Sequence, residues 1–196
     1  MSARPPRGEA RRALILEATL RVVGSDGPGA VTHRRVAAEA GLPLAATTYW
    51  FSSKDELLAE AFALAAARDA ERVRALAAEL RSHAEVDVAA AVTALLSAEL
   101  AGGRTALIAF YALSLEAARN PGLRATEAAW SAAYHEAVEG ILAHGGSPSP
   151  AVDARVLVAA IDGLVLEQLA AGEDGDVAAA VRPVIDRLLA ALLRPA

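Results

Sequence analysis

Apolar residues recur at intervals of three and four along almost the whole sequence, and this spacing most restricts the fold. Such intervals line one face of an α-helix, whereas a half-buried strand alternates every second residue, a pattern that no segment sustains. Alanine, the strongest helix former, supplies 51 of the 196 residues. We therefore expect an all-α protein. Besides the short helices between residues 31 and 54, glycine and proline breaks predict helices near residues 11–23, 87–101, 104–119, 123–143, 150–171 and 176–193.

Two short helices joined by a tight turn are expected between residues 31 and 50. Thr32 is a good N-cap for the first, which runs from Val31 or Thr32 to Ala40, and Gly41 can end it in a left-handed conformation. Pro43 can occupy the first turn of the next helix, which Leu44 to Trp50 continue. This spacing is typical of a helix-turn-helix, although a helical hairpin without a nucleic-acid role has the same pattern.

A longer helix is expected to follow directly. Ser53 is its N-cap, and Glu56 three residues later completes a capping box. Leu57, Leu58 and Phe62 then fall in helical register, and the pattern continues to Leu80.

The polar residues of this region favour DNA binding over the plain hairpin. Ala45, Thr48 and Tyr49 form one outward face of the second short helix, while Thr47 and Trp50 turn inward. A small, hydroxyl-bearing face suits a recognition helix in the major groove. Basic residues can reach phosphates or a guanine edge. The predicted DNA-contacting residues are Thr32, His33, Arg34, Arg35, Leu44, Ala45, Thr48, Tyr49, Trp50 and Lys54.

Charge is distributed unevenly in a way that fits this interpretation. Residues 1–54 hold 8 Lys/Arg against 4 Asp/Glu, a local +4, and residues 55–196 hold 11 against 20, a local −9. A basic head suggests a polyanionic partner. The chain has no cysteine, no segment long enough to cross a membrane and no visible secretory signal, so we expect a cytoplasmic protein without disulfides.

Residues 31–58 closely resemble the DNA-binding segment of TetR-family transcriptional regulators. A threonine opens the first short helix, Ala37 and Gly41 match Ala-x-x-x-Gly at the turn, and aromatic residues close the second helix. Phe51-x-x-Lys-x-x-Leu57 then leads into the long helix, and the likeness covers residues 11–62. One position departs: Thr48 stands where the family commonly has a phosphate-binding tyrosine, and Tyr49 follows it, so either could make the main phosphate contact.

The resemblance implies a division into two domains. Residues 1–54 would be a helix-turn-helix DNA-binding domain with a flexible arm at residues 1–10, and residues 55–196 a helical ligand-binding and dimerisation domain. The implied function is a homodimeric repressor that binds palindromic double-stranded operator DNA and is released by a small, largely apolar effector. No cofactor is implied.

The last two helices supply candidate dimer contacts. The helix at 150–171 is apolar almost all round, which predicts that both of its sides are covered, and the helix at 176–193 carries one apolar stripe. A four-helix interface across a two-fold axis would cover them, and the alternative is a wholly intramolecular core. The predicted interface residues are Val156, Gly163, Leu164, Val181, Ile185, Leu188 and Leu192.

Aromatic residues are only 4% of the chain, so their clustering in the acidic body is informative. They predict a largely apolar pocket with a few polar anchors, although ordinary core packing would cluster them equally. The candidate effector-binding residues are Phe62, Phe110, Tyr111, Glu116, Trp130 and Tyr134, with His135 as a further anchor.

Other function classes find less support in the sequence. His135-Glu136-x-x-Glu139 lacks the second histidine of a zinc-binding helix, and Glu79 with His83 gives too few ligands, so no metal site is expected. Gly-x-Ser-x-Gly, P-loop and dinucleotide-binding patterns are absent, which disfavours a helical enzyme. The main alternative is a helical small-molecule-binding or carrier protein that lacks DNA-binding activity.

Overall fold

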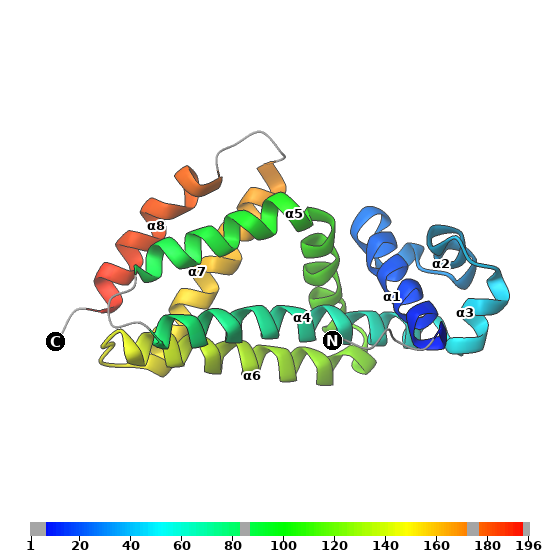
Figure 1. Cartoon of the computed structure of the whole chain (residues 1–196), viewed down its shortest axis with the longest axis horizontal. Helices are drawn as coiled ribbons and strands as arrows, with labels where there is room; N and C mark the ends of the chain where they lie inside the picture. Colours follow the sequence, from blue (N-terminus) through cyan, green and yellow to red (C-terminus); the bar gives the residue numbers. More distant parts are fainter. Residues whose placement is uncertain (1–6, 83–86, 172–176, 194–196) are drawn as a thin grey trace. The chain divides into compact units, whose positions relative to one another are not determined.

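A computed structural model describes residues 7–82, 87–171 and 177–193, and in these residues the protein is helical with loops (Figure 1). The expectation of an all-α fold is confirmed. The elements in chain order are α1 (Arg7–Asp26), the 3-10 turn η1 (Pro28–Ala30), α2 (His33–Ala40), α3 (Leu44–Trp50), α4 (Lys54–Arg81), α5 (Val88–Ala117), α6 (Pro121–His144), α7 (Pro150–Ala171) and α8 (Val177–Leu192).

The chain divides into two compact units. The first comprises Met1–Arg68 and Thr105–Ala129, and the second Asp69–Arg104 and Trp130–Ala196. Three helices, α4, α5 and α6, therefore contribute residues to both units. The functional boundary expected at Lys54 lies inside the first unit and stays a prediction.

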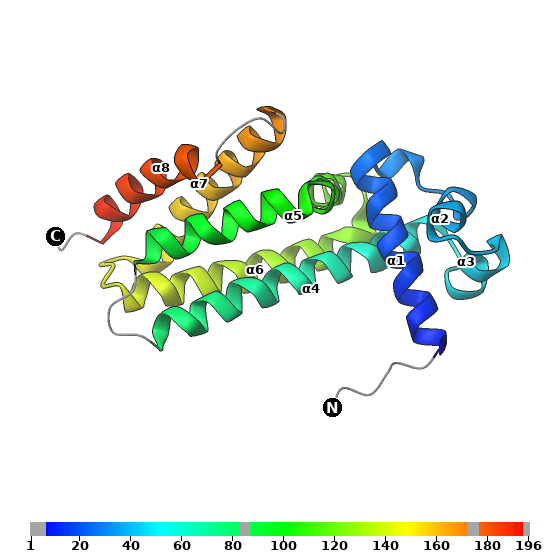
Figure 2. The same ribbon diagram turned by 45° about the horizontal axis from the view of Figure 1, so that its top comes forward.

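The first unit is built around α1, which packs on η1 and α2 (Figure 2). Ile15, Val22, Val36, Phe51 and Leu57 are all fully or almost fully buried in its core. These side chains come from α1, α2, the end of α3 and the start of α4. The short helices, each too small to be stable alone, are thus held by a shared apolar core.

α1 is longer than the expected 11–23, because Gly24 lies inside the helix instead of ending it. A Cβ atom at Gly24 would stand 2.2 Å from the backbone oxygen of Thr105 in α5. The glycine is therefore required for close packing of α1 on α5, a role that a local sequence pattern does not report.

The turn of the helix-turn-helix has the expected caps. The Thr32 hydroxyl accepts a hydrogen bond from the Arg35 N–H at 3.1 Å, and Gly41 adopts the left-handed conformation with φ 64° and ψ 32°. Pro43 differs from expectation: its ψ of 146° is extended, so it is the N-cap residue and α3 begins at Leu44. Extended backbone at this position sets the direction in which α3 leaves the turn.

The capping box of α4 is displaced by one residue. The Ser53 hydroxyl accepts from the Glu56 N–H at 3.1 Å, as expected. The Glu56 carboxylate, however, accepts from the N–H and the hydroxyl of Ser52, at 2.6 and 2.7 Å, and not from Ser53. These bonds, the backbone one foremost, hold the pKa of Glu56 below its usual value.

The segments expected at 87–101 and 104–119 form one element, α5, with a kink in place of a loop. Gly103 has a non-helical backbone there, with φ −143° and ψ 20°. The helix resumes after this single irregular residue.

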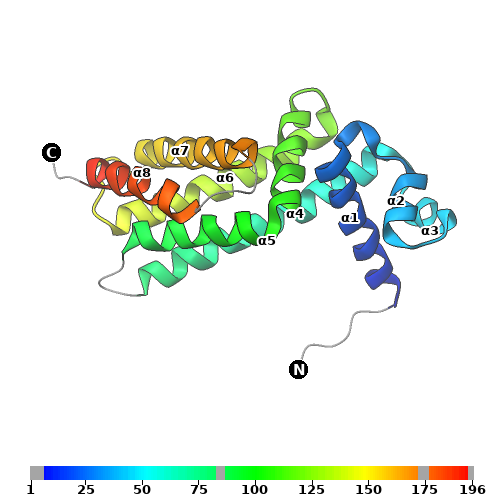
Figure 3. The same cartoon turned by 90° about the horizontal axis from the view of Figure 1, so that it is seen from above.

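The second unit contains α7 and α8, which pack against each other (Figure 3). The buried face of α7 includes Leu157, Ile161 and Val165, and that of α8 includes Val181 and Ile185. In the described ranges no helix combines the length and the apolar character that a membrane crossing requires.

Candidate functional site

The outer face of α3 lies in the first unit and is open to solvent. Ala45, Thr48 and Tyr49 are exposed, Tyr49 by 80%, whereas Thr47 is fully buried, as the helical spacing predicted. Leu44 is exposed by 44% at the start of the helix. α3 therefore presents a short face of small, hydroxyl and phenolic side chains.

α1 supports this face from behind. Trp50 is half-buried, and a Cβ added to Gly8 would lie 3.4 Å from its ring, so α1 begins beside the indole. The Arg12 guanidinium lies 5.5 Å from the centre of the Phe51 ring and pairs with Glu60 at 2.7 Å. Trp50 touches Tyr49 edge-on, with ring centres 5.3 Å apart. Trp50, one of the predicted DNA-contacting residues, therefore packs against Tyr49 and helps to position it.

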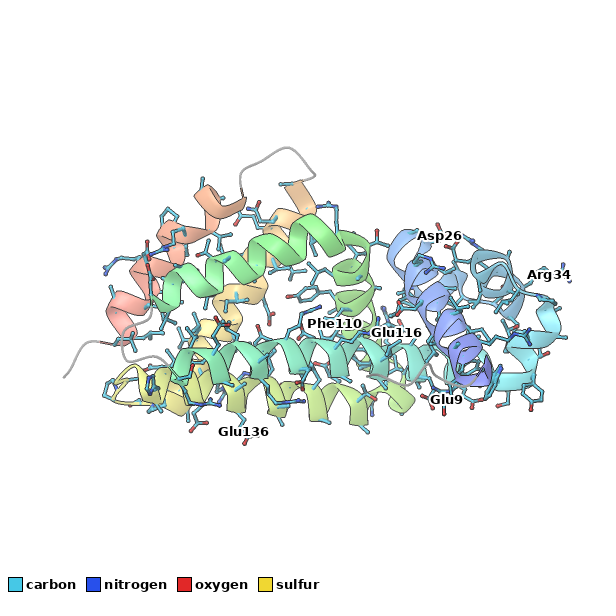
Figure 4. All side chains as sticks on the ribbon, in the orientation of Figure 1. Glu9, Asp26, Arg34, Phe110, Glu116 and Glu136 are labelled. Atoms are coloured by element: carbon cyan, nitrogen blue, oxygen red, sulfur yellow. The ribbon has the colours of Figure 1, made fainter. Side chains whose placement is uncertain are left out.

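Arg34 and Arg35 are neighbours with different surroundings. Arg34 is exposed, and Figure 4 shows it at the far side of α2, pointing away from the helices. Arg35 is held by two carboxylates, Asp26 at 3.0 Å and Glu39 at 3.2 Å, and Glu39 also accepts from Arg21 at 2.8 Å. The Asp26 bond foremost, with Glu39 next, raises the pKa of Arg35 above its ordinary value. Arg35 thus fixes α2 to α1 rather than standing free for DNA.

The remaining predicted DNA contacts also gather in this unit. The Lys54 ammonium is exposed at the start of α4 and donates to the Gly29 carbonyl at 3.3 Å. Thr32 is exposed while its hydroxyl caps α2. The Nδ1 atom of His33 is buried and has no hydrogen-bond partner among the described residues, so this ring is turned partly inward.

The candidate effector residues belong to both compact units, and each unit is described by itself. In the first unit, Phe62 and Phe110 are buried with ring centres 5.7 Å apart, and Tyr111 contacts Phe110 edge-on. Glu116, on the same helix as Phe110, forms an ion pair with Arg119 at 3.2 Å. Phe62 and Phe110 are therefore packed together inside the first unit, as core residues are, and their assignment to an effector pocket stays a prediction.

Trp130 and Tyr134 lie in the second unit, with ring centres 5.3 Å apart and both side chains half-buried. The Trp130 indole N–H donates to the Asp69 carboxylate at 2.7 Å, and Arg72 pairs with the other oxygen of Asp69 at 2.8 Å. Sequence reasoning missed Asp69. The available signal was an acidic residue beside the apolar positions Ala70 and Val73 of α4.

The predicted dimer residues fall in three environments. Val181 and Ile185 are fully buried in the core of the second unit, so their assignment as outer contacts was wrong: the stripe of α8 faces its own unit. Leu164, Leu188 and Leu192 are half-buried, and Val156 and Gly163 are exposed. The exposed small and apolar residues of α7 form a stripe at heptad-like intervals: Val152, Val156, Ala159, Gly163 and Leu166.

The histidines take no part in a metal cluster that the structure describes. His135 Nδ1 lies 2.7 Å from the Ser131 carbonyl. His83, the expected partner of Glu79, lies outside the described residues. Across the described ranges, no three His, Asp or Glu side chains are grouped to hold a metal ion.

A helix-turn-helix with an exposed polar face, followed by a longer helical body, defines a DNA-binding transcriptional regulator. Two family descriptions match the chain: "Bacterial regulatory proteins, tetR family" over residues 15–61, and "Tetracyclin repressor-like, C-terminal domain" over residues 83–193. The chain belongs to the TetR family, whose members are regulators and not enzymes.

Solved structures are similar over nearly the whole chain. The multidrug binding protein EbrR, solved with imidazole, is 35% identical, with 98% of each chain covered and a TM-score of 0.69. A TetR-family member from Streptomyces coelicolor is 36% identical over 93% of this chain and 98% of its own, with a TM-score of 0.73. The regulator PksA of Bacillus subtilis is 42% identical over 69 residues, and the match spans only 34% of its length and 35% of this chain.

Proposed function

We propose that this protein is a ligand-responsive repressor that binds palindromic operator DNA as a homodimer and leaves it when a small molecule binds. The observation that carries the proposal is the exposed face of α3, in which Tyr49 is 80% exposed, and the packing of α1 against the opposite side of this helix. Rigid support matters because base contacts require fixed side-chain positions.

In this proposal, different residues make the apolar, the phosphate and the charged contacts to DNA. α3 enters the major groove, where Ala45 and Leu44 offer apolar contact with thymine methyl groups. Tyr49 and Thr48 donate to phosphates, and Tyr49 makes the main phosphate contact because the Thr48 hydroxyl lies 3.3 Å from the Ala45 carbonyl of its own helix. Lys54 and Arg34 contribute charge at the two edges of this surface.

The α7 stripe supports the homodimer. Residues spaced at i, i+4, i+7, i+11 and i+14 on one helix match the seam through which two helices pack. Gly163 lies in its centre, and a Cβ atom there would meet nothing within 4 Å, so a partner backbone can approach closely. A two-fold dimer would hold two copies of α3 about 34 Å apart, the repeat of palindromic half-sites.

Small-molecule control is supported by the relatives. EbrR is described as a multidrug binding protein and was solved with imidazole and with ethidium. The chain of the ethidium complex is 34% identical to this protein, and the match covers 94% of this chain. A ligand can release DNA only if it binds one dimer conformation more tightly than the other. α4 contributes residues to both compact units, so it is the element we propose carries the signal. A role on chromosomal DNA also implies a cytoplasmic location.

Binding to DNA from immediately upstream of the protein's own gene tests the proposal. Fluorescence anisotropy should show salt-sensitive binding to a palindromic site, and replacing Tyr49 or Lys54 by alanine should weaken it about tenfold while the dimer stays intact. Lys54→Ala should also reduce the salt slope by about one. Ligand binding without affinity for any such site would favour a carrier protein and overturn the proposal.

A further inference from the structure

Asp69 is a mostly buried carboxylate of the second unit. Its side chain is only 13% exposed and lies on the α4 face that also buries Ala70 and Val73. A carboxylate removed from water is stable only with hydrogen bonds or a counter-charge. Here it has both, from the Trp130 indole N–H and from Arg72.

The two partners of Asp69 are not equivalent. The indole is part of a ring pair, because Tyr134 lies one helical turn along α6 and its ring centre is 5.3 Å from that of Trp130. Arg72 is 46% exposed and sits three residues from Asp69 on the same helix. Because its guanidinium reaches solvent while the indole lies on a neighbouring helix, Arg72 is the partner that can exchange.

We propose that Asp69, Trp130 and Tyr134 form the charge-recognising part of the effector site, that this site takes a planar organic cation, and that Arg72 supplies the counter-charge when no effector is bound. The inference rests on the ligand response proposed above and adds the chemical class of the ligand. The carboxylate would pair with the cation, and the two ring faces would stack on its plane. Arg72 would turn to solvent, leaving the charge of the site unchanged.

The same helix provides a matched control. Glu71 and Arg74 also form an ion pair at i, i+3, at 2.5 Å, but Glu71 is 73% exposed. The two pairs share spacing, helix and charge, and they differ in burial and in the indole contact. An effect caused by surface charge alone would appear in both pairs.

Two probes separate charge from shape. N-methylphenanthridinium and phenanthridine share one planar ring system, and only the first carries a permanent positive charge. In calorimetric titrations without DNA, the full chain should bind the cation at least about tenfold more tightly than the neutral probe. Equal affinity, a preference for the neutral probe, or no binding of the cation would overturn the proposal.

Variants then locate the site. Asp69→Asn should weaken cation binding by about tenfold or more and leave the neutral probe within about twofold, because only the charge is removed. Arg72→Ala should tighten cation binding by roughly twofold, since it removes the competing guanidinium. Glu71→Gln and Arg74→Ala should behave as the unchanged protein. A damaged fold cannot tighten binding, so a weaker or unchanged cation affinity in Arg72→Ala would contradict the exchange even if Asp69→Asn folds poorly.

Operator binding distinguishes this inference from the proposed function. Glu71→Gln should bind operator DNA, and be released by N-methylphenanthridinium, as the unchanged protein is. The cation should release the unchanged protein at a lower concentration than it releases Asp69→Asn. If the unchanged protein binds the cation through Asp69 but binds no DNA, the regulatory function fails while the site stands. If it binds DNA and both proteins are released equally, the site fails while the regulatory function stands.

Discussion

The two compact units use their charges in different ways. In the first, ion pairs join separate helices: Arg12 to Glu60, Arg21 to Glu39, Arg35 to Asp26 and Arg68 to Glu17. In the second, Asp69 with Arg72, Glu71 with Arg74 and Arg182 with Asp186 lie within one helix. The division is not complete, because Arg182 also pairs with Asp87 in the second unit and Arg35 with Glu39 inside α2 in the first. Pairs between helices fix the helices relative to each other, whereas pairs within a helix leave its packing free. In the first unit, ion pairs thus join the helices around the proposed DNA-reading face, while the second unit exposes apolar residues of α7.

Truncating Phe62 tests whether the first unit is a firmly packed core, beyond what its ion pairs contribute, and should have the largest effect. Phe62 is fully buried against Phe110, so Phe62→Ala should lower the free energy of unfolding by about 3–5 kcal/mol through lost burial and a cavity. Urea unfolding followed by circular dichroism measures it. A loss below about 1 kcal/mol would mean that this side chain lines a ligand site and not the core.

A charge on the α7 stripe tests the second half. Val156 is exposed by 43%, so Val156→Asp should leave the monomer folded, but like charges facing each other across a two-fold interface should cost several kcal/mol of association. Sedimentation velocity should show a shift from dimer to monomer. Leu115→Asp on α5, where Leu115 is 69% exposed, is the matched control and should leave the dimer unchanged. A dimer that survives Val156→Asp would refute the assignment of this face.

Arg34 and Arg35 provide a sharper test within the head, with a smaller expected effect. Arg34→Ala should weaken operator binding by about 1–3 kcal/mol if it reaches a guanine edge, with no change in melting temperature. Arg35→Ala should lower the melting temperature because it breaks the contacts to Asp26 and Glu39. Anisotropy and calorimetry on both variants measure the two effects. The opposite assignment of the two effects would show that Arg35 contacts DNA directly.

Lowering the pH should slightly reduce the stability of the first unit, because Glu39 becomes protonated. Its two arginine partners, Arg21 foremost, hold the pKa of Glu39 below its ordinary value of 4.5. A group whose pKa is lower in the folded protein stabilises the fold above its unfolded pKa, and this contribution is lost as pH falls through the folded value. The melting temperature of Glu39→Gln should therefore be lower than that of the unchanged protein at pH 7, and the difference should shrink below about pH 4.5. A constant difference across this range would show that the ion pairs contribute nothing.

What the sequence predicted correctly is mostly local. Thr32, Gly41 and Ser53 cap helices within a few residues of themselves, so their roles follow from neighbouring positions. The outward face of α3 follows from helical spacing alone. These features place the proposed DNA-reading surface before any tertiary contact is known.

The features that the sequence did not reveal depend on residues far apart in the chain. Gly24 appeared to end α1, but the atom that requires a glycine there belongs to Thr105. Trp130 appeared as one of several pocket aromatics, and its partner Asp69 lies 61 residues earlier. The buried stripe of α8 was assigned to a dimer because an apolar face does not indicate which surface covers it. Helical periodicity identifies the apolar face of a helix, but the three-dimensional fold is needed to identify the surface that covers it.

Two adjacent residues of α4, Arg68 and Asp69, contact different helices, the first through an ion pair and the second through a hydrogen bond. Arg68 pairs with Glu17 of α1, and the next residue, Asp69, accepts from Trp130 of α6. Each residue of an α-helix advances the chain by about 1.5 Å and turns it by about 100°. Inserting or deleting a single residue between these two would therefore turn one set of contacts away from its partners. The register of α4 at this point is thus shared by the two contacts, and a change of its length there can preserve both only if one partner surface changes as well.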